Sequence, residues 1–319
     1  MSRSNTPKVS VCIPTFNNAN YLHQAIESVL KQNDQDFEIV IVDNCSTDHT
    51  IKLVKGLQNK GNGRIRFYKN DRNIGLAGNF NKCLKYAQGA YIKFLCSDDV
   101  LLPGCLEKMV AALDAHQSVT LVCSGRLAIS GIGEKLGCKQ YPSTDVIIRG
   151  SNVTTKCLFG KNYIGEPTAV MFRKRDLTGH FRDDLPQLMD MEMWFQLLEQ
   201  GDLLNIEEPL CAIRSHSGQM THANKKTGKL IDDNVKLFDE YSLKSYLEIT
   251  LLLVLQRKML MTYRVWMSRK FIADSKKKMI LEQYASKLAY MFMPLIGPLV
   301  GYSISLEKWV IRRMRNFHL

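Results

Sequence analysis

The sequence predicts an α/β protein built on a mostly parallel sheet, followed by a helical C-terminal extension. The first hundred residues alternate between short β-branched apolar segments and longer segments whose apolar residues recur every three or four positions. Such alternation implies right-handed crossovers, so the strands run parallel and helices cover both faces of the sheet. From about residue 228 the pattern is helical only. We therefore expect an α/β domain at 1–224 and a helical region at 225–319.

The first hundred residues supply the elements of the parallel sheet in chain order. FEIVIVD is a continuous apolar run, typical of a strand covered on both faces. Asn20 is the expected N-cap of the first helix, and Gly89 is expected to close the third. The expected elements are strands at 8–14, 37–43, 65–70 and 91–97, and helices at 20–31, 46–57 and 75–88.

Beyond residue 118 the pattern is looser. VTLVCSGRLAIS at 119–130 and GEPTAVMFRK at 165–174 are expected strands. MDMEMWFQLLEQG is an amphipathic helix that Gly201 should end. These segments complete the expected α/β domain.

Three polar segments follow three of the expected parallel strands. They are PTFNN at 14–18, DNCSTD at 43–48 and SDD at 97–99. In open α/β sheets the ligand site lies beyond the carboxyl ends of the strands, so all three should share one rim. Two adjacent carboxylates in SDD repel each other, which predicts that a positive charge binds there.

Charge and cysteine content narrow the class of protein. The net charge is +12, and residues 225–319 hold 18 Lys/Arg against 8 Asp/Glu. The aromatic residues there are not interleaved with basic ones, so we do not expect a nucleic-acid partner. Nine cysteines without metal-ligand spacing favour a reducing compartment. The first residues contain no apolar run long enough for a signal peptide, so none is expected. A cytoplasmic location is expected.

The ordered set of motifs resembles family-2 glycosyltransferases with the GT-A fold. The donor-side segments are VSVCIPTFNNANYLHQAIESVLKQ, EIVIVDNCSTDHT, DRNIGLAGNFNKCL and IKFLCSDDV. DMEMWFQLLEQG resembles the acidic acceptor-side motif of the family, and IRSHSGQMT resembles its terminal Arg/His segment. The motifs span roughly 8–221 in order, and the resemblance implies inverting sugar transfer of the kind used in O-antigen or capsule assembly.

The resemblance implies a nucleotide-sugar site at the rim. Its implied nucleotide-binding residues are Pro14, Thr15, Asn17, Asp43, Arg72 and Asp98. Asp43 would accept a hydrogen bond from the imide N–H of a pyrimidine, and Arg72 lies in the loop that would close over base and phosphates. Asn44 stands where many UDP-sugar enzymes have a second Asp, so uridine and thymidine donors both remain open. Turn chemistry is the alternative explanation for these loop residues.

A divalent cation, Mn²⁺ or Mg²⁺, fits the acidic motif. It would neutralise the charge that grows on a diphosphate leaving group, and such ions prefer oxygen ligands. The resemblance makes Asp99 the direct metal ligand and places Asp98 nearer the ribose. It puts His216 near the diphosphate as a second candidate metal ligand, with Arg214 beside it. Cys96 occupies a position that is often Asp, so the number of coordinating carboxylates stays open. The alternative for SDD is a cap for the following helix.

Asp190 is the expected general base that deprotonates an acceptor hydroxyl. Met189 stands where family members often carry Glu, and this apolar neighbour would raise the pKa of Asp190. Glu166, Glu192 and Trp194 are expected on the acceptor side. The alternative for Asp190 is a helix cap.

Residues 288–306 predict a membrane-associating element. They contain no charged side chain over 19 residues, but two prolines and two glycines interrupt any straight helix. Basic residues flank both ends, so a kinked element in the cytoplasmic leaflet, held by anionic lipid, fits better than a single crossing. The alternative is a buried helical hairpin of the soluble domain.

The combined expectation is a peripheral enzyme at the inner face of the cell membrane. It would transfer a sugar from a UDP- or dTDP-sugar to a hydroxyl of a lipid-linked glycan by a metal-assisted single displacement. Transfer to polyprenyl phosphate is one alternative. A catalytically silent protein that binds a sugar nucleotide or a glycan is the other.

Overall fold

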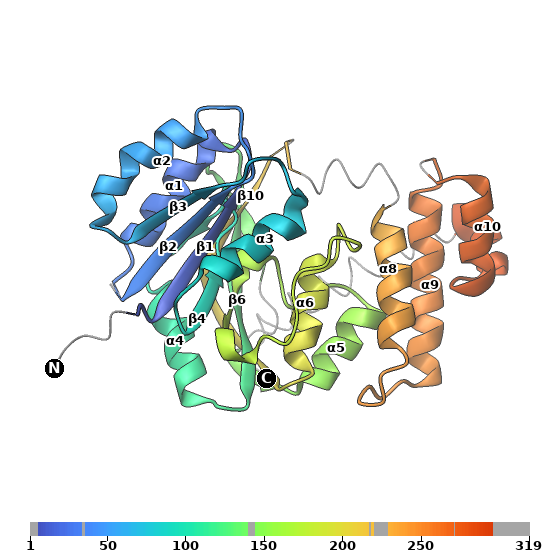
Figure 1. The fold of residues 1–319 in the computed structure, drawn as a ribbon. Helices are drawn as coiled ribbons and strands as arrows, with labels where there is room; N and C mark the ends of the chain where they lie inside the picture. The colour runs from blue at the N-terminus through green and yellow to red at the C-terminus, as the bar shows by residue number, and fades with distance from the viewer. Residues whose placement is uncertain are drawn as a thin grey trace. The chain divides into compact units, whose positions relative to one another are not determined.

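The computed structural model describes residues 6–33, 36–139, 144–216, 218–219, 229–270 and 272–295 (Figure 1). The chain divides into two compact units. The first comprises residues 1–154 and 162–219, and the second comprises residues 155–161 and 220–319. The second unit therefore takes in a short piece of chain that the sequence assigned to the α/β domain.

One mixed sheet forms the centre of the first unit. Within the described residues its strand order is β3-β2-β1-β4-β9-β6-β10-β5, with β7 paired to β6 and β8 to β10. The strands are β1 (Val9–Thr15), β2 (Phe37–Asp43), β3 (Ile65–Lys69), β4 (Tyr91–Phe94), β5 (Val100–Leu101), β6 (Val119–Ser130), β7 (Lys135–Lys139), β8 (Val146–Ile148), β9 (Val170–Arg173) and β10 (Asp202–Ser215).

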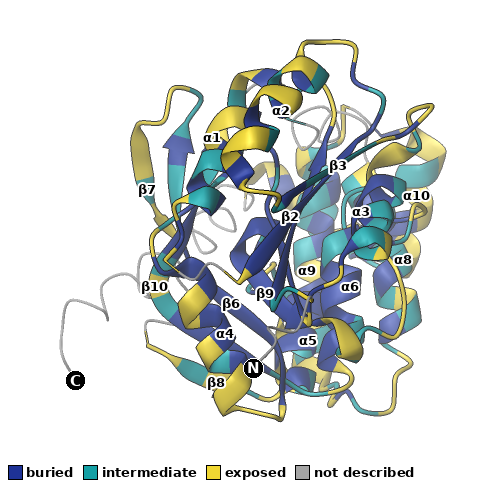
Figure 2. Ribbon diagram, turned by 60° about the vertical axis from the view of Figure 1, so that its left-hand side comes forward, coloured by how far each residue is buried: buried dark blue, intermediate teal, exposed yellow. Residues whose placement is uncertain are grey.

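The first four strands form the parallel half that the sequence predicts. β1 pairs in parallel with both β2 and β4, and β2 pairs in parallel with β3. Helices α1 (Ala19–Leu30) and α2 (Thr50–Gln58) lie on one side of these strands and α3 (Gly75–Tyr86) on the other (Figures 1 and 2). Every residue of β1 and β2 is consequently buried, which explains their unbroken apolar character.

The second half of the sheet departs from the parallel pattern. β9 runs antiparallel to β4 and β6, and β5 and β8 run antiparallel to β10. β10 pairs in parallel with β6, with register shifts on either side of Pro209, which has no N–H to donate to a neighbouring strand. Helices α4 (Cys105–Ala115), α5 (Gly150–Phe159) and α6 (Met189–Leu198) connect these strands. The α/β fold class is confirmed, with a sheet that is parallel only in part.

Two predicted helix ends differ from the structure. The prediction of Asn20 as N-cap is wrong, because α1 begins at Ala19 and the cap position is Asn18. The Ala19 N–H is satisfied instead by Asp48 Oδ2 at 3.1 Å. Gly89 lies beyond the end of α3, and a Cβ there would come within 2.5 Å of the Ser10 nitrogen. Gly89 is therefore required by its close approach to β1 and does not cap the helix.

The second unit is helical where it is described. It contains α8 (Lys229–Tyr241), α9 (Leu251–Met267) and α10 (Asp274–Gln283). Its core consists of Ile231, Met261, Val265, Ile272, Ile280, Leu281 and Ala285. Within the described ranges no helix is both long and apolar enough to cross a membrane. The predicted membrane element at 288–306 is described only to residue 295, and the rest of it lies outside the described residues.

Candidate active site

The three polar segments do lie together on one rim of the sheet. Asn18 Nδ2 donates to Ser97 Oγ at 2.8 Å, which joins the loop after β1 to the SDD segment. The Asn17 N–H donates to Ser46 Oγ at 2.8 Å, and Asn17 Oδ1 accepts from the Thr47 N–H at 2.8 Å. These side-chain bonds fix the loops after β1, β2 and β4 relative to one another.

Asp43 is turned into the protein at this rim. Its side chain is fully buried, and its oxygens accept from the Ser46 N–H at 3.1 and 3.3 Å and from the Ser46 hydroxyl. A hydrogen bond from a pyrimidine base to Asp43, as expected from the sequence, would require this turn to open. Thr15 at the end of β1 is 2% exposed, and its Oγ1 has no hydrogen-bond partner among the described residues. That hydroxyl is free to bind a ligand that reaches the rim.

Asn44 is used entirely by the protein. Its Oδ1 accepts from Asn70 Nδ2 at 3.1 Å and from the Ile74 N–H at 2.9 Å. Its Nδ2 donates to Asn73 Oδ1 at 2.9 Å and to the Gly75 carbonyl at 3.1 Å. All four hydrogen-bonding positions of the amide are therefore occupied. Asn44 holds the 70–75 loop and does not face a nucleotide base.

Arg72 and Pro14 occupy different environments at the rim. Arg72 is exposed on the 70–75 loop that Asn44 holds, so its guanidinium is accessible to a phosphate. Pro14 is buried within β1, opposite Val42. Its contribution is the shape of the strand end that presents Thr15.

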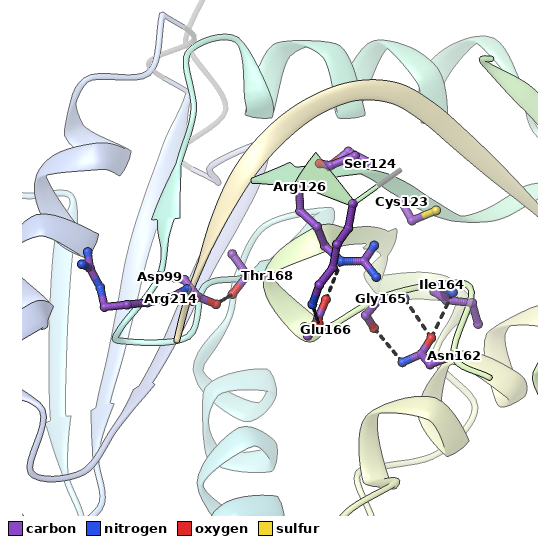
Figure 3. Close-up of polar contacts among 12 residues, drawn as sticks. Asp99, Cys123, Ser124, Arg126, Asn162, Ile164, Gly165, Glu166, Thr168 and Arg214 are labelled. Carbon is purple, nitrogen blue, oxygen red and sulfur yellow. Dashed lines mark hydrogen bonds and ion pairs between the residues drawn. The ribbon is translucent and has the colours of Figure 1, made fainter. Parts of the chain in front are cut away.

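Asp99 is anchored on both carboxylate oxygens. Its Oδ1 accepts from the Arg214 N–H at 2.9 Å and its Oδ2 accepts from Thr168 Oγ1 at 2.6 Å (Figure 3). The residue is only 3% exposed. Burial and the neighbouring charge of Asp98 raise the pKa of Asp99 well above its ordinary value. Two protein donors therefore fix the position of this carboxylate beneath the rim.

Asp98 is the carboxylate that meets another candidate ligand. Its Oδ2 lies 3.1 Å from His216 Nε2 and accepts from Gln219 Nε2 at 3.2 Å. The His216 ring packs 4.8 Å from the ring of Tyr21, which limits its orientation. Asp98 is therefore the carboxylate of the pair that contacts His216, whereas Asp99 is bonded to Thr168 and Arg214.

Arg214 holds the SDD turn in place through its guanidinium group. Its Nε donates to the Asp98 carbonyl at 2.7 Å, and its Nη1 donates to the Gly131 carbonyl at 3.1 Å. Its Nη2 donates to Gln24 Oε1 at 2.7 Å, and the guanidinium lies over the Tyr21 ring. Arg214 is 3% exposed, so it clamps the SDD turn and does not present its charge to a diphosphate.

The donor set fits a cation that is shared with the substrate. Across the described part of the chain, no three His, Cys, Asp or Glu side chains converge to hold a metal by themselves. Mg²⁺ and Mn²⁺ commonly use one or two protein oxygens and take their remaining ligands from phosphate and water. Asp98 with His216 matches such an incomplete site.

Asp190 lies in the first turn of α6 but does not cap it. The cap position is Leu188, and Asp190 Oδ1 accepts only from its neighbouring Met191 N–H, at 2.7 Å, among the contacts of the described chain. Burial, reinforced by the negative charge of Glu166, raises the pKa of Asp190 to about 7. A carboxyl with this pKa can accept a proton near neutral pH.

Glu166 is held by cations from β6 and β7. Its Oε2 lies 2.6 Å from Arg126 Nε (Figure 3). Its Oε1 lies 3.4 Å from Lys139 Nζ. Burial alone would raise the pKa of Glu166, but these two positive charges outweigh burial and hold that pKa below its ordinary value. Gly165 has a φ of +128°, and a Cβ there would come within 2.9 Å of the Arg126 guanidinium. The glycine therefore allows the Arg126–Glu166 pair to form.

Glu192 and Trp194 are placed in the core of the first unit. Glu192 is 4% exposed, and its Oε2 accepts from Gln196 Nε2 at 2.7 Å. Trp194 is fully buried, and its Nε1 donates to the Gly165 carbonyl at 3.3 Å. Neither side chain is open to an acceptor in this geometry. Trp194 instead supports the segment that carries Glu166.

The sequence interpretation missed two residues beneath the site. Thr168 bonds to Asp99 and also accepts from the Cys96 N–H at 3.0 Å. Lys93, fully buried on β4, donates to the Thr168 carbonyl at 2.6 Å and lies 3.5 Å from Met109 Sδ. A lysine inside an otherwise apolar strand was the available signal, because burying such a group costs free energy unless hydrogen bonds compensate. Its contact with Thr168, 75 positions away, could not be read from the sequence.

A groove away from the rim does not compete as the active site. It has a volume of about 610 Å³ and lies against α4, β8 and the first part of β10. Two of its three Lys, Asp and Glu lining residues, Lys108 and Glu208, form an ion pair, and the third is Asp145. None of the residues predicted for catalysis or donor binding lines it.

Comparisons with known proteins identify the family. A profile described as Glycosyl transferase family 2 matches residues 10–180. The chain belongs to this family. This family-2 glycosyltransferase is 31% identical over 216 residues to EpsE of Bacillus subtilis, which is itself named a glycosyltransferase. The match covers 66% of this chain and 74% of EpsE. An uncharacterized protein of Mycobacterium tuberculosis is 32% identical over 220 residues, covering 66% and 68% of the two chains.

Solved structures agree with the fold assignment. Staphylococcus aureus TarS residues 1–349, in complex with UDP-GlcNAc, matches with a TM-score of 0.60 at 20% identity, covering 83% of this glycosyltransferase and 71% of that chain. A mannosyltransferase from Pyrobaculum calidifontis, in complex with GDP-Man and Mn²⁺, matches with a TM-score of 0.57 at 16% identity, covering 98% and 84%. Both neighbours bind nucleotide-sugar donors and share this fold.

Proposed function

We propose that this glycosyltransferase moves a sugar from a UDP- or dTDP-sugar to a hydroxyl group of a lipid-linked glycan, with inversion at the anomeric carbon. The observation that carries the proposal is the cluster of carboxyl groups at the rim. Asp98, Asp99 and Asp190 all lie close enough to Cys96 that their charges add to burial in raising the pKa of its thiol. Donor-side and acceptor-side carboxyls therefore lie near the same thiol.

On the donor side, Asp98 and His216 would hold Mn²⁺ or Mg²⁺ together with the diphosphate. The ion would neutralise the charge that develops on the departing nucleotide. Arg72 is exposed on the 70–75 loop and would add a second positive charge to the phosphates. Asp99 would act through its bonds to Thr168 and Arg214, by fixing the turn that presents Asp98.

On the acceptor side, Asp190 would take the proton from the attacking hydroxyl. The new C–O bond forms on the face of the sugar opposite the nucleotide, so one displacement inverts the anomeric centre. A base with a pKa of about 7 suits this proton transfer near neutral pH. Glu166, held by Arg126 and Lys139, would border the acceptor.

The same base separates the candidate functions. Transfer to polyprenyl phosphate uses an acceptor that is already an anion and needs no strong base. A silent binding protein needs no carboxyl with a raised pKa at all. The position and pKa of Asp190 therefore favour a hydroxyl acceptor, such as a glycan under assembly for O-antigen or capsule at the inner face of the membrane.

The experiment begins with a panel of UDP-, dTDP- and GDP-sugars in a thermal-shift assay with and without Mn²⁺. We expect stabilisation by a pyrimidine donor that requires the metal. The donor that binds is then tested for transfer by wild type and by Asp190→Asn. Undiminished transfer by that variant would leave the phosphate acceptor as the better candidate, and absence of turnover in wild type with every acceptor would favour a binding protein.

A further inference from the structure

Helix α9 of the second unit turns two arginines inward, beside the core residues Met261 and Val265. Arg257, at 4% exposure, donates to the Leu158 and Asn234 carbonyls, each at 2.6 Å. Arg264 donates to the Gly160 carbonyl at 3.0 Å from the same side of the helix. Burial, together with the charge of Arg264, lowers the pKa of Arg257 to about 9. Two cations thus point into the unit, where burial disfavours them.

The outward face of α9 is apolar. Leu251, Leu252, Leu255 and Met259 are 76%, 74%, 53% and 36% exposed, and together they form what we call the α9 face. Positions separated by three, four and eight residues lie on one side of a helix, so these side chains form a continuous stripe. Eleven of the sixteen large apolar side chains exposed in the described part of the chain belong to the second unit. Such a concentration marks an interaction surface.

The exposed charged residues of α9 and of the turn that follows it are of one sign. Residues 249–273 contain no Asp or Glu, while Lys258, Arg269 and Lys270 are exposed. A symmetric contact between two copies of the chain would bring these like charges together. Anionic lipid headgroups would supply the opposite charge, and the acyl boundary would supply an apolar environment for the leucines.

We propose that the α9 face rests on the surface of an anionic membrane, with the four apolar side chains at the headgroup boundary and Lys258, Arg269 and Lys270 against lipid phosphates. The proposed membrane contact rests on the proposed function in one respect, because a lipid-linked acceptor lies in the membrane and the enzyme must reach it there. The contact itself does not require catalysis. It assigns docking to a described helix, separate from the predicted element at 288–306.

The test uses the full chain in sedimentation with vesicles of phosphatidylcholine alone or with roughly one third phosphatidylglycerol. We expect binding only to the anionic vesicles, weakened by salt because the headgroup attraction is screened. Leu251→Ser/Leu252→Ser/Leu255→Ser should reduce the partition coefficient more than about tenfold. Lys258→Gln/Arg269→Gln/Lys270→Gln should remove the preference for phosphatidylglycerol.

A matched control carries serines at equally exposed apolar positions of the first unit. Ile132→Ser/Leu136→Ser replaces side chains that are 83% and 61% exposed and should bind vesicles like wild type. Undiminished vesicle binding by the triple serine variant would overturn the proposal. So would a wild-type dimer in analytical ultracentrifugation that the triple variant dissociates, because the α9 face would then be a contact between copies.

Two readouts keep this proposal separate from the proposed function. Circular dichroism melting shows whether each variant is folded, and a folded Leu255→Ser single variant replaces the triple variant if the latter is not. Thermal shift with UDP and Mn²⁺ reports on nucleotide binding, which the proposed function assigns to residues of the first unit. If wild type does not bind the nucleotide, the donor proposal is refuted, whereas the result of the vesicle experiment is unaffected.

Discussion

Replacing Asp190 with Asn should stabilise the protein while removing its activity. In the unfolded chain this carboxyl releases its proton near pH 3.8, whereas in the folded protein burial and the Glu166 charge hold the proton until about pH 7. The folded state therefore binds more protons than the unfolded state between these values. Stability consequently falls as the pH rises through that window, and above it the full cost of a buried charge is present.

The size of the effect follows from the pKa difference. A shift from 3.8 to about 7 corresponds to about 4 kcal/mol at pH 8 and above. The carboxyl is partly exposed, so water reduces this cost, and we expect a gain of roughly 2–4 kcal/mol for Asp190→Asn at pH 8. At pH 5 most of the folded carboxyl is already neutral, and the gain should fall to roughly 1–2 kcal/mol.

Thermal unfolding of both proteins at pH 5 and pH 8 measures this difference. For a chain of this size we expect the variant to melt roughly 5–10 °C above wild type at pH 8 and less than half as much above it at pH 5. Transfer should fall by about two to four orders of magnitude with UDP-sugar affinity unchanged. An equal shift at both pH values, or a lower melting temperature at pH 8, would show that Asp190 is not a buried carboxyl with a raised pKa.

Three further substitutions test the site. Asp98→Asn should abolish Mn²⁺-dependent UDP binding in calorimetry, whereas Asp99→Asn should lower the melting temperature and retain metal dependence. The opposite result would support Asp99 as the direct ligand, which the family resemblance implies. Lys93→Met should lower kcat more than about tenfold while the protein stays folded, because the Thr168 carbonyl loses its hydrogen bond from Lys93. The control Arg173→Met removes another buried cation bonded to carbonyls, and it should lower stability without changing kcat per folded molecule. Asn44→Asp should destabilise the protein by about 1–3 kcal/mol, because Asn73 Oδ1 and the Gly75 carbonyl lose their donor. A gain in UDP affinity at unchanged stability would mean that residue 44 contacts the base.

Contacts with distant residues distinguish the two adjacent aspartates of the site. Adjacent Asp98 and Asp99 are indistinguishable in a motif, and the difference between them arises from Thr168, Arg214 and His216, which lie more than 60 positions away along the chain. The direction of a side chain depends on which distant segment packs against it. The sequence therefore located the pair of aspartates, and the resemblance implied a role for each, but the contacts of each carboxylate could not be read from it.

The order of the first strands and helices, the shared rim and the acidic position in α6 could all be read from the sequence by itself. Each depends on periodicity, turn residues and the direction of parallel strands, which are properties of neighbouring residues. Only the tertiary structure decided that β9 runs antiparallel between β4 and β6, and that Asn44 faces a loop. It also decided that the arginines of α9 point inward while its leucines point out. Burial and pairing are set by the whole folded chain, so a local pattern cannot determine them.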